Sequence, residues 1–206
     1  MDELILDFSG MYAEEEFLPS SAKYFDFKSL EGTNCYCDQG AASALRSALK
    51  DCSYKGLHWI DTGDYHYCSL FFLEKIGFQC SLALFDNHSD DFESPVLSCG
   101  SWVRTYLQDF NGCLFTGGSG SKVYLSIDKD VLSRDYARTN WDQGSMTLPE
   151  LLDRISCIAD SNEIIGIDVC GGICSSKGAC AEDYGINRKT DEILRDFLLH
   201  LKSDKY

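Results

Sequence analysis

The chain has 206 residues, 44% of them hydrophobic, which is typical of one domain with a substantial core. Its 33 acidic residues against 18 basic ones give a formal charge of −15, which argues against nucleic acids and anionic membranes as partners. No stretch is apolar for the roughly 18 residues of a membrane span, and the first residues lack the basic region of a signal peptide. We therefore expect one domain over residues 1–206 in the cytoplasm, with self-association into a homo-oligomer left open.

Strands and helices are predicted to alternate along the chain, because short apolar runs alternate with segments of helical spacing. The predicted strands cover residues 3–8, 24–27, 57–61, 80–86, 123–127 and 163–169. The predicted helices cover residues 38–51, 65–76, 101–107 and 190–202, and a further helix begins after Thr147. Asp38 and Thr147 are suitable N-caps, and Pro149 suits a first helical turn. This alternation predicts an α/β fold with a mostly parallel sheet flanked by helices.

The chain contains 11 cysteines, but they do not indicate a disulfide scaffold. Their number is odd, they are scattered through predicted strands and helices, and nothing suggests secretion. Most are expected to be small buried residues. Two groups remain as an alternative zinc or redox site, namely Cys35 with Cys37, and Cys170 with Cys174 and Cys180.

Two predicted strands end in closely spaced acidic and histidine residues, and a third leads to a further histidine. Alternate residues of an extended segment point the same way, so each motif can direct its side chains to one place. The carboxyl ends of neighbouring parallel strands share one edge of a sheet, so the three motifs can meet there. The candidate metal ligands are His66, Asp86, His88, Asp90, Asp128 and Asp130.

This ligand set predicts two divalent cations. Four carboxylates in one place would repel each other and could not all stay ionised without cations among them. Mostly oxygen ligands with a minority of imidazoles suit Mn²⁺, so we expect two Mn²⁺ per chain in a hydrolytic site. The alternative is that each Asp caps a helix or lies in a loop, because the Asp-x-Asp spacing alone is common.

The three motifs resemble the metal-binding motifs of the arginase (ureohydrolase) superfamily, in the same chain order, and the resemblance extends over about residues 57–169. It implies a three-layer arginase-like α/β fold, with a mostly parallel sheet and a binuclear manganese centre at the carboxyl ends of its strands. It also implies that a hydroxide bridging the metals attacks a guanidino carbon or a related amide-like carbon.

The chain departs from the superfamily at two positions. Arginases carry a proton-shuttling His shortly after the second motif, whereas residues 97–103 contain none. The leaving amine would then be protonated by a metal ligand, for which Asp90 is the catalytic candidate, by a metal-bound water, or by a group on the loop at residues 134–143. The Glu that binds the guanidinium in the family corresponds to Gly171 here. Three other carboxylates are candidates for that role, namely Asp168, as a second catalytic residue, and Glu182 and Asp183.

The loop at residues 131–144 directly follows the third motif and is expected to lie over the metals. Asn140 and Trp141 are its substrate-binding candidates, because Trp stacks well on a planar cation. The alternative is a polar loop in which Trp141 is only a packed anchor. Asp64 is expected to orient the imidazole of His66.

Together these features predict a manganese-dependent hydrolase of non-peptide C–N bonds that releases urea from a guanidino substrate. This substrate would be a small molecule or an arginine side chain within a peptide. Two alternatives stay open: a deacetylase-like or formimino hydrolysis at the same metals, and a metal-containing sensor or complex subunit without turnover.

Overall fold

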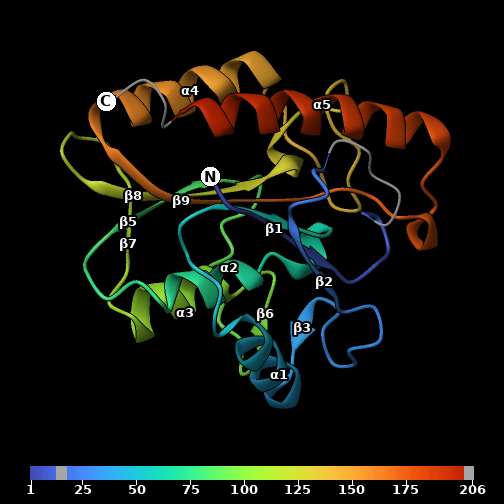
Figure 1. Ribbon diagram of the computed structural model, residues 1–206, viewed down its shortest axis with the longest axis horizontal. Helices are drawn as coiled ribbons and strands as arrows, with labels where there is room; N and C mark the ends of the chain where they lie inside the picture. The colour runs from blue at the N-terminus through green and yellow to red at the C-terminus, as the bar shows by residue number, and fades with distance from the viewer. Residues whose placement is uncertain (13–17, 202–206) are drawn as a thin grey trace.

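The computed structural model describes residues 1–12 and 18–201 and has a seven-stranded sheet between two layers of helices (Figure 1). The strand order is β2-β1-β4-β9-β8-β5-β7, and every hydrogen-bonded pair is parallel. The strands are β1 (Glu3–Asp7), β2 (Lys23–Asp26), β4 (Leu57–Ile60), β5 (Ser81–Phe85), β7 (Cys113–Leu114), β8 (Lys122–Asp128) and β9 (Glu163–Cys170). Two short strands, β3 (Tyr36–Cys37) and β6 (Leu97–Ser98), pair antiparallel in a separate sheet.

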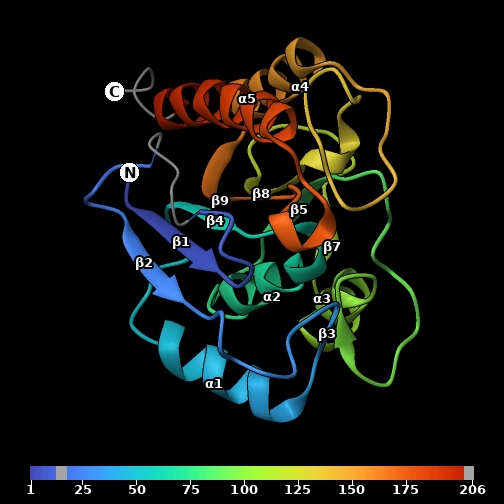
Figure 2. The same cartoon turned by 90° about the vertical axis from the view of Figure 1, so that its right-hand side faces the viewer.

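The helices form one layer on each face of the large sheet. One layer contains α1 (Gln39–Leu49), α2 (Cys68–Leu73) and α3 (Trp102–Asp109), and the other contains α4 (Leu148–Ser161) and α5 (Ala181–His200), as Figures 1 and 2 show. The 3₁₀ turns are η1 (Gly63–Tyr65), η2 (Lys129–Val131) and η3 (Ser175–Lys177). None of the helices within residues 1–12 and 18–201 is long and apolar enough to cross a membrane.

The predicted caps begin two of these helices. The Asp38 carboxylate accepts a hydrogen bond from the Ala41 backbone N–H at 2.8 Å at the start of α1. At α4, Thr147 and Glu150 form a capping box, in which each side chain accepts a hydrogen bond from the backbone N–H of the other. These local bonds explain why the starts of α1 and α4 were predictable.

Residue alternation along the strands builds a core on each face. In β1, Leu4 and Leu6 pack toward α1 and α2, whereas Ile5 packs toward α4 and α5. In β8, Tyr124 belongs to the first core and Leu125 to the second. Ser126 and Asp128, two and four residues after Tyr124, therefore lie on the same face of β8 as Tyr124.

Several predicted boundaries were wrong. The helix expected at 65–76 is the η1 turn followed by a six-residue α2. The last helix was expected to start at 190 but begins at Ala181, because the Asn187 side chain bonds the backbone of Arg138 and offsets the weak helix propensity around Gly185. Residue 202, its expected end, lies outside the described residues. Strands β3, β6 and β7 were not predicted, because two residues carry no readable alternation.

One buried ion pair joins the third ligand motif to the outer helix layer. Lys129, between Asp128 and Asp130, is fully buried, and its ammonium lies 2.7 and 2.8 Å from the two carboxylate oxygens of Asp191 on α5. Both groups lose water on burial, so each depends on the other for its charge partner. The pair therefore fastens η2 to α5.

We expect Asp191→Ala to lower the free energy of unfolding by about 3–5 kcal/mol, because it leaves the Lys129 ammonium buried without a carboxylate. Urea unfolding at neutral pH measures the change. The control is Glu192→Ala, which removes an exposed carboxylate 3.5 Å from Arg188 and should change stability by less than about 1 kcal/mol. Equal losses in the two variants would contradict a structural role for the buried pair.

Candidate metal centre

Three of four adjacent strands deliver the predicted ligands to one edge of the sheet. Strands β4, β9, β8 and β5 are neighbours, and the ligand motifs follow β4 and β5 and end β8. Their carboxyl ends share an edge because the strands are parallel, which is where open α/β sheets bind ligands. All six predicted ligands meet there: His66, Asp86, His88, Asp90, Asp128 and Asp130.

The ligand atoms form two groups that share one carboxylate. In the first group, His66 Nδ1 lies 3.0 Å from Asp86 Oδ2 and 3.1 Å from Asp90 Oδ2. Asp128 Oδ2 lies 3.8 Å from the same nitrogen. In the second group, His88 Nδ1 lies 2.9 Å from Asp130 Oδ2 and 3.5 Å from Asp86 Oδ1. Asp86 therefore presents one oxygen to each group, as a carboxylate bridging two cations would.

Neighbouring donors fix the direction of these carboxylates. Asp90 Oδ2 accepts the indole N–H of Trp102 at 2.7 Å, and Asp130 Oδ1 accepts the backbone N–H of Asn87 at 3.0 Å. Asp128 Oδ1 accepts the backbone N–H of Asp130 at 2.9 Å. Residue 90 has a φ of +49°, which is costly for a residue other than glycine and is typical of functional positions.

A chain of hydrogen bonds determines which nitrogen of His66 faces the site. Ser126 Oγ donates to Asp168 Oδ1 at 2.6 Å and can therefore accept from His66 Nε2, 2.9 Å away. The lone pair is then left on Nδ1, a buried atom for which the described residues offer no hydrogen-bond partner. Such an orphaned nitrogen beside two carboxylate oxygens fits a metal ligand, and outer partners of this kind orient metal-binding histidines.

The pKa values of the clustered side chains also indicate a metal site. Burial, together with the charges of Asp128 and Asp86, raises the pKa of Asp130 to about 9. Burial and the charge of Asp86 raise the pKa of Asp128 to about 6. Burial disfavours the charged form of His66, but Cys170 and the carboxylates of Asp86 and Asp90 outweigh it and raise the pKa of this imidazole. Without cations the cluster holds extra protons, so the residues present fit two divalent cations.

The cysteines do not assemble into the alternative sites. All 11 are free thiols. Among the described residues, Cys170 alone joins a group of potential ligands, and it does so beside His66 and Asp128 rather than with Cys174 and Cys180. Its Sγ lies 3.2 Å from Asp128 Oδ2.

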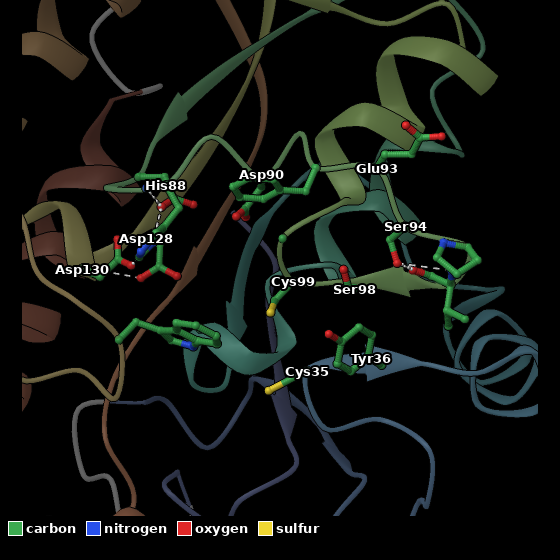
Figure 3. Close-up of a pocket in the computed structure, with 17 residues that line it drawn as sticks. Cys35, Tyr36, His88, Asp90, Glu93, Ser94, Ser98, Cys99, Asp128 and Asp130 are labelled. Atoms are coloured by element: carbon green, nitrogen blue, oxygen red, sulfur yellow. Dashed lines mark hydrogen bonds and ion pairs between the residues drawn. The ribbon is translucent and has the colours of Figure 1, made fainter.

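A cavity of about 620 Å³ opens onto the ligands. Its wall includes His88, Asp90 and Trp141. Figure 3 shows Tyr36 and Ser94 on the side away from His88, with Cys35 between them. Trp141 is the one substrate-binding candidate that reaches the cavity. Asn140, Glu182 and Asp183 are not part of its wall: Asn140 bonds Asp64, Glu182 is exposed in the first turn of α5, and Asp183 caps α5.

Asp64 fixes the loop beside the candidate ligands rather than the ring of His66. Its buried Oδ1 accepts the indole N–H of Trp141 at 2.9 Å and the amide of Asn140 at 2.8 Å, and Lys177 lies 3.3 Å from Oδ2. The expectation that Asp64 orients His66 is therefore wrong, and Ser126 has that place. The indole of Trp141 is consequently held in one orientation beside His88, at a centroid distance of 5.9 Å.

Two positions bear on the guanidinium-binding role that the family resemblance implies. Gly171 has a φ of +87°, and a Cβ there would overlap with Asp128 Oδ1, so this position cannot hold a glutamate without displacing a ligand. Asp168 is fully buried one pleat below the rim, opposite Ser126 in the β8–β9 register. It reaches the centre only through Ser126 and His66, which makes it a positioning residue and not a group that touches substrate.

Comparison with known proteins identifies a relative of the chain by sequence. No protein-family model matches it. An uncharacterized protein of Thermotoga maritima is 30% identical over 192 residues, covering 81% of this chain and 78% of the relative. At this identity and coverage the two proteins belong to the same family.

Solved structures define the fold. An arginase from Medicago truncatula has a TM-score of 0.65 at 13% identity, over 97% of this chain and 87% of that one. The proclavaminate amidino hydrolase of Streptomyces clavuligerus has a TM-score of 0.65 at 14% identity, over 100% and 92%. A Trypanosoma cruzi formiminoglutamase variant with Mn²⁺ has a TM-score of 0.58 at 11% identity, over 95% and 93%. The chain therefore has the predicted fold of the arginase (ureohydrolase) superfamily.

The raised pKa values predict how the stability of the metal-free protein depends on pH. An ordinary Asp releases its proton near pH 4, whereas Asp130 keeps its own until about pH 9 in the folded state. The folded state binds more protons than the unfolded state in this range, so the free energy of unfolding should fall as pH rises. The raised pKa of His66 has the same sign.

Thermal unfolding between pH 5 and 9, with chelator and with Mn²⁺, measures this effect. Saturating Mn²⁺ should raise the melting temperature most at high pH, because cations replace the lost protons. Asp130→Asn should weaken the pH dependence of the metal-free protein, whereas Asp91→Asn, at an exposed neighbouring position, should preserve it. A pH-independent melting temperature without metal, unchanged by Mn²⁺, would contradict the site.

Proposed function

We propose that the protein is a manganese-dependent hydrolase that cleaves a C–N bond of a guanidino substrate and releases urea. The observation that carries this proposal is the Asp86 carboxylate, with one oxygen in each of two ligand groups that also contain His66 and His88. Two Mn²⁺ bound there would activate a water molecule as the nucleophile near neutral pH and polarise the carbon under attack. The arginase, amidino hydrolase and formiminoglutamase that share the fold support this reaction class.

The chain's own residues would position the ligands and move one proton. Asp168 and Ser126 hold the imidazole of His66 so that Nδ1 faces the centre. The indole N–H of Trp102 donates a hydrogen bond to Oδ2 of Asp90, and burial raises the pKa of this carboxyl group. We assign to Oδ1 of Asp90 the transfer of a proton to the leaving amine, in place of the family's absent His.

Trp141 is the residue that would face the planar reacting group. Its ring is fixed through the bond to Asp64 and lines the cavity beside the ligands. A guanidinium stacked on this ring would gain cation–π energy of about 0.5–2 kcal/mol. The cavity also has room for a guanidino group carried by a peptide.

One observation favours a second candidate, the hydrolysis of an uncharged amide or formimino group. Among the described residues that line the cavity, Glu93 is the one carboxylate outside the ligand set. Figure 3 shows its side chain turned away from His88, Asp128 and Asp130. A guanidinium would therefore lack a free carboxylate partner, whereas a neutral group needs none.

Product analysis with Mn²⁺ separates the candidates. Agmatine, L-arginine and a blocked arginine-containing peptide are tested for urea, an N-acetylated amine for acetate, and a formimino compound for formamide. Urea from a guanidine supports the proposal, and acetate or formamide alone supports the second candidate. No product from any of them would favour a metal-containing protein without turnover.

We expect Asp90→Asn to lower kcat by about 10²–10⁴-fold, because it removes both a ligand charge and the proposed proton carrier. Asn tolerates the left-handed backbone at residue 90, and its amide oxygen can accept from Trp102, so the variant should fold. The matched control is Asp91→Asn, which changes an exposed residue. Near-normal turnover of Asp90→Asn at saturating Mn²⁺ would overturn the assigned role.

A further inference from the structure

Exposed apolar side chains gather around the cavity. Ten large apolar side chains are exposed in the described chain, and four of them, Tyr36, Phe92, Val96 and Trp141, line this one cavity. Phe92 and Tyr36 are the most exposed of the ten, at 67% and 61%. Exposed apolar side chains grouped at one place mark a binding site, whereas scattered ones are ordinary.

Tyr36, Phe92, Pro95 and Val96 form what we call the apolar shelf. Tyr36 lies on β3, and the other three precede β6, so the small antiparallel sheet holds both parts together. The Phe92 backbone N–H bonds Gly100 at 2.9 Å, and the Ser94 hydroxyl bonds the Val96 carbonyl at 2.7 Å. These hydrogen bonds therefore hold the backbone of the shelf in place.

The shelf and the ligands are opposite ends of the same cavity. Figure 3 shows His88, Asp128 and Asp130 on one side, Tyr36 and Ser94 on the other, and Cys35 and Cys99 between them. Burial and the charge of Asp64 raise the pKa of Cys35 to about 11. Burial and the neighbouring Cys35 raise the pKa of Cys99 to about 12. The floor between the two ends is therefore uncharged at neutral pH.

The volume of the cavity exceeds the need of the reacting group. A water takes about 30 Å³ of liquid volume, so a planar group of four heavy atoms takes on the order of 100 Å³. The cavity measures about 620 Å³, within the range of pockets that enclose drug-sized ligands. Most of its space is therefore not needed by the reacting group, and of the four exposed apolar side chains only Trp141 lies beside the ligands.

We propose that the apolar shelf binds an aromatic or branched aliphatic body of the substrate, joined by a short chain to the group that is hydrolysed at the metals. The assignment of the reacting end rests on the function proposed above, whereas the shelf rests on its own exposure and volume. Because the shelf is continuous with the ligand site, its occupant is part of the substrate and not a separate partner.

Two metal-binding probes test the shelf without turnover. Acetohydroxamate and 4-phenylbutyrohydroxamate have the same metal-binding head, and only the second reaches across the cavity. With Mn²⁺ bound, calorimetry should give about 10–100-fold tighter binding of the phenyl probe, as expected from burial of about one aromatic ring. Equal affinities would overturn the proposed shelf. Binding of both probes would in that case still support the proposed metal centre.

Variants test whether the shelf residues cause the difference in affinity between the two probes. The double variant Tyr36→Ser, Phe92→Ser should reduce the affinity ratio of the two probes by about tenfold or more. Both residues are more than half exposed, so the variant should fold. Phe110→Ser removes an exposed aromatic residue outside the cavity and should keep the wild-type ratio. An unchanged ratio in the double variant would overturn the proposal.

A third probe keeps the two proposals distinguishable. If neither hydroxamate binds in the presence of Mn²⁺, the proposed metal function fails, and 4-phenylbutanamide, which has no metal-binding head, decides the shelf. Added to metal-free protein, it should bind measurably to the wild type in calorimetry and more weakly to the double variant. The absence of binding to the wild type, or equal binding to the two proteins, would overturn the shelf.

Discussion

The mutual repulsion of four carboxylates at one edge of the sheet is the constraint on which the rest of the site depends. Asp86, Asp90, Asp128 and Asp130 lie within a few residues of strand ends and are largely withdrawn from water. Without cations, burial and mutual repulsion raise the pKa values of Asp90, Asp128 and Asp130 and lower the stability of the fold at neutral pH. The two divalent cations that we propose would remove this cost, while the donors from Trp102 and two backbone amides hold the oxygens in place.

Contacts outside the ligand set hold the surroundings of this edge in place. Lys129 fixes the third motif to α5 through Asp191, and Asp64 fixes the loop that carries Trp141. The small sheet of β3 and β6 adds a wall on the opposite side of the cavity. One end of the cavity is therefore highly charged and rigid, whereas the other is apolar, and this asymmetry is the main clue to its substrate.

The ligand set was predictable because it depends on strand periodicity and on the common edge of parallel strands. All six candidate ligands lie at this edge for that reason. Asp168 was misjudged, because periodicity gives the face of a side chain but not its depth, and Asp168 lies one pleat below Cys170 and the rim. The role of Ser126 and the burial of Lys129 depend on partners 42 and 62 residues away, which a single sequence does not reveal.

Anomalous diffraction at the manganese edge, from crystals grown with Mn²⁺, tests the central claim most directly. The account predicts two peaks, one among His66, Asp86, Asp90 and Asp128 and the other among Asp86, His88 and Asp130, with Asp86 contacting both. A single peak, or peaks elsewhere in the molecule with these carboxylates unliganded, would contradict it.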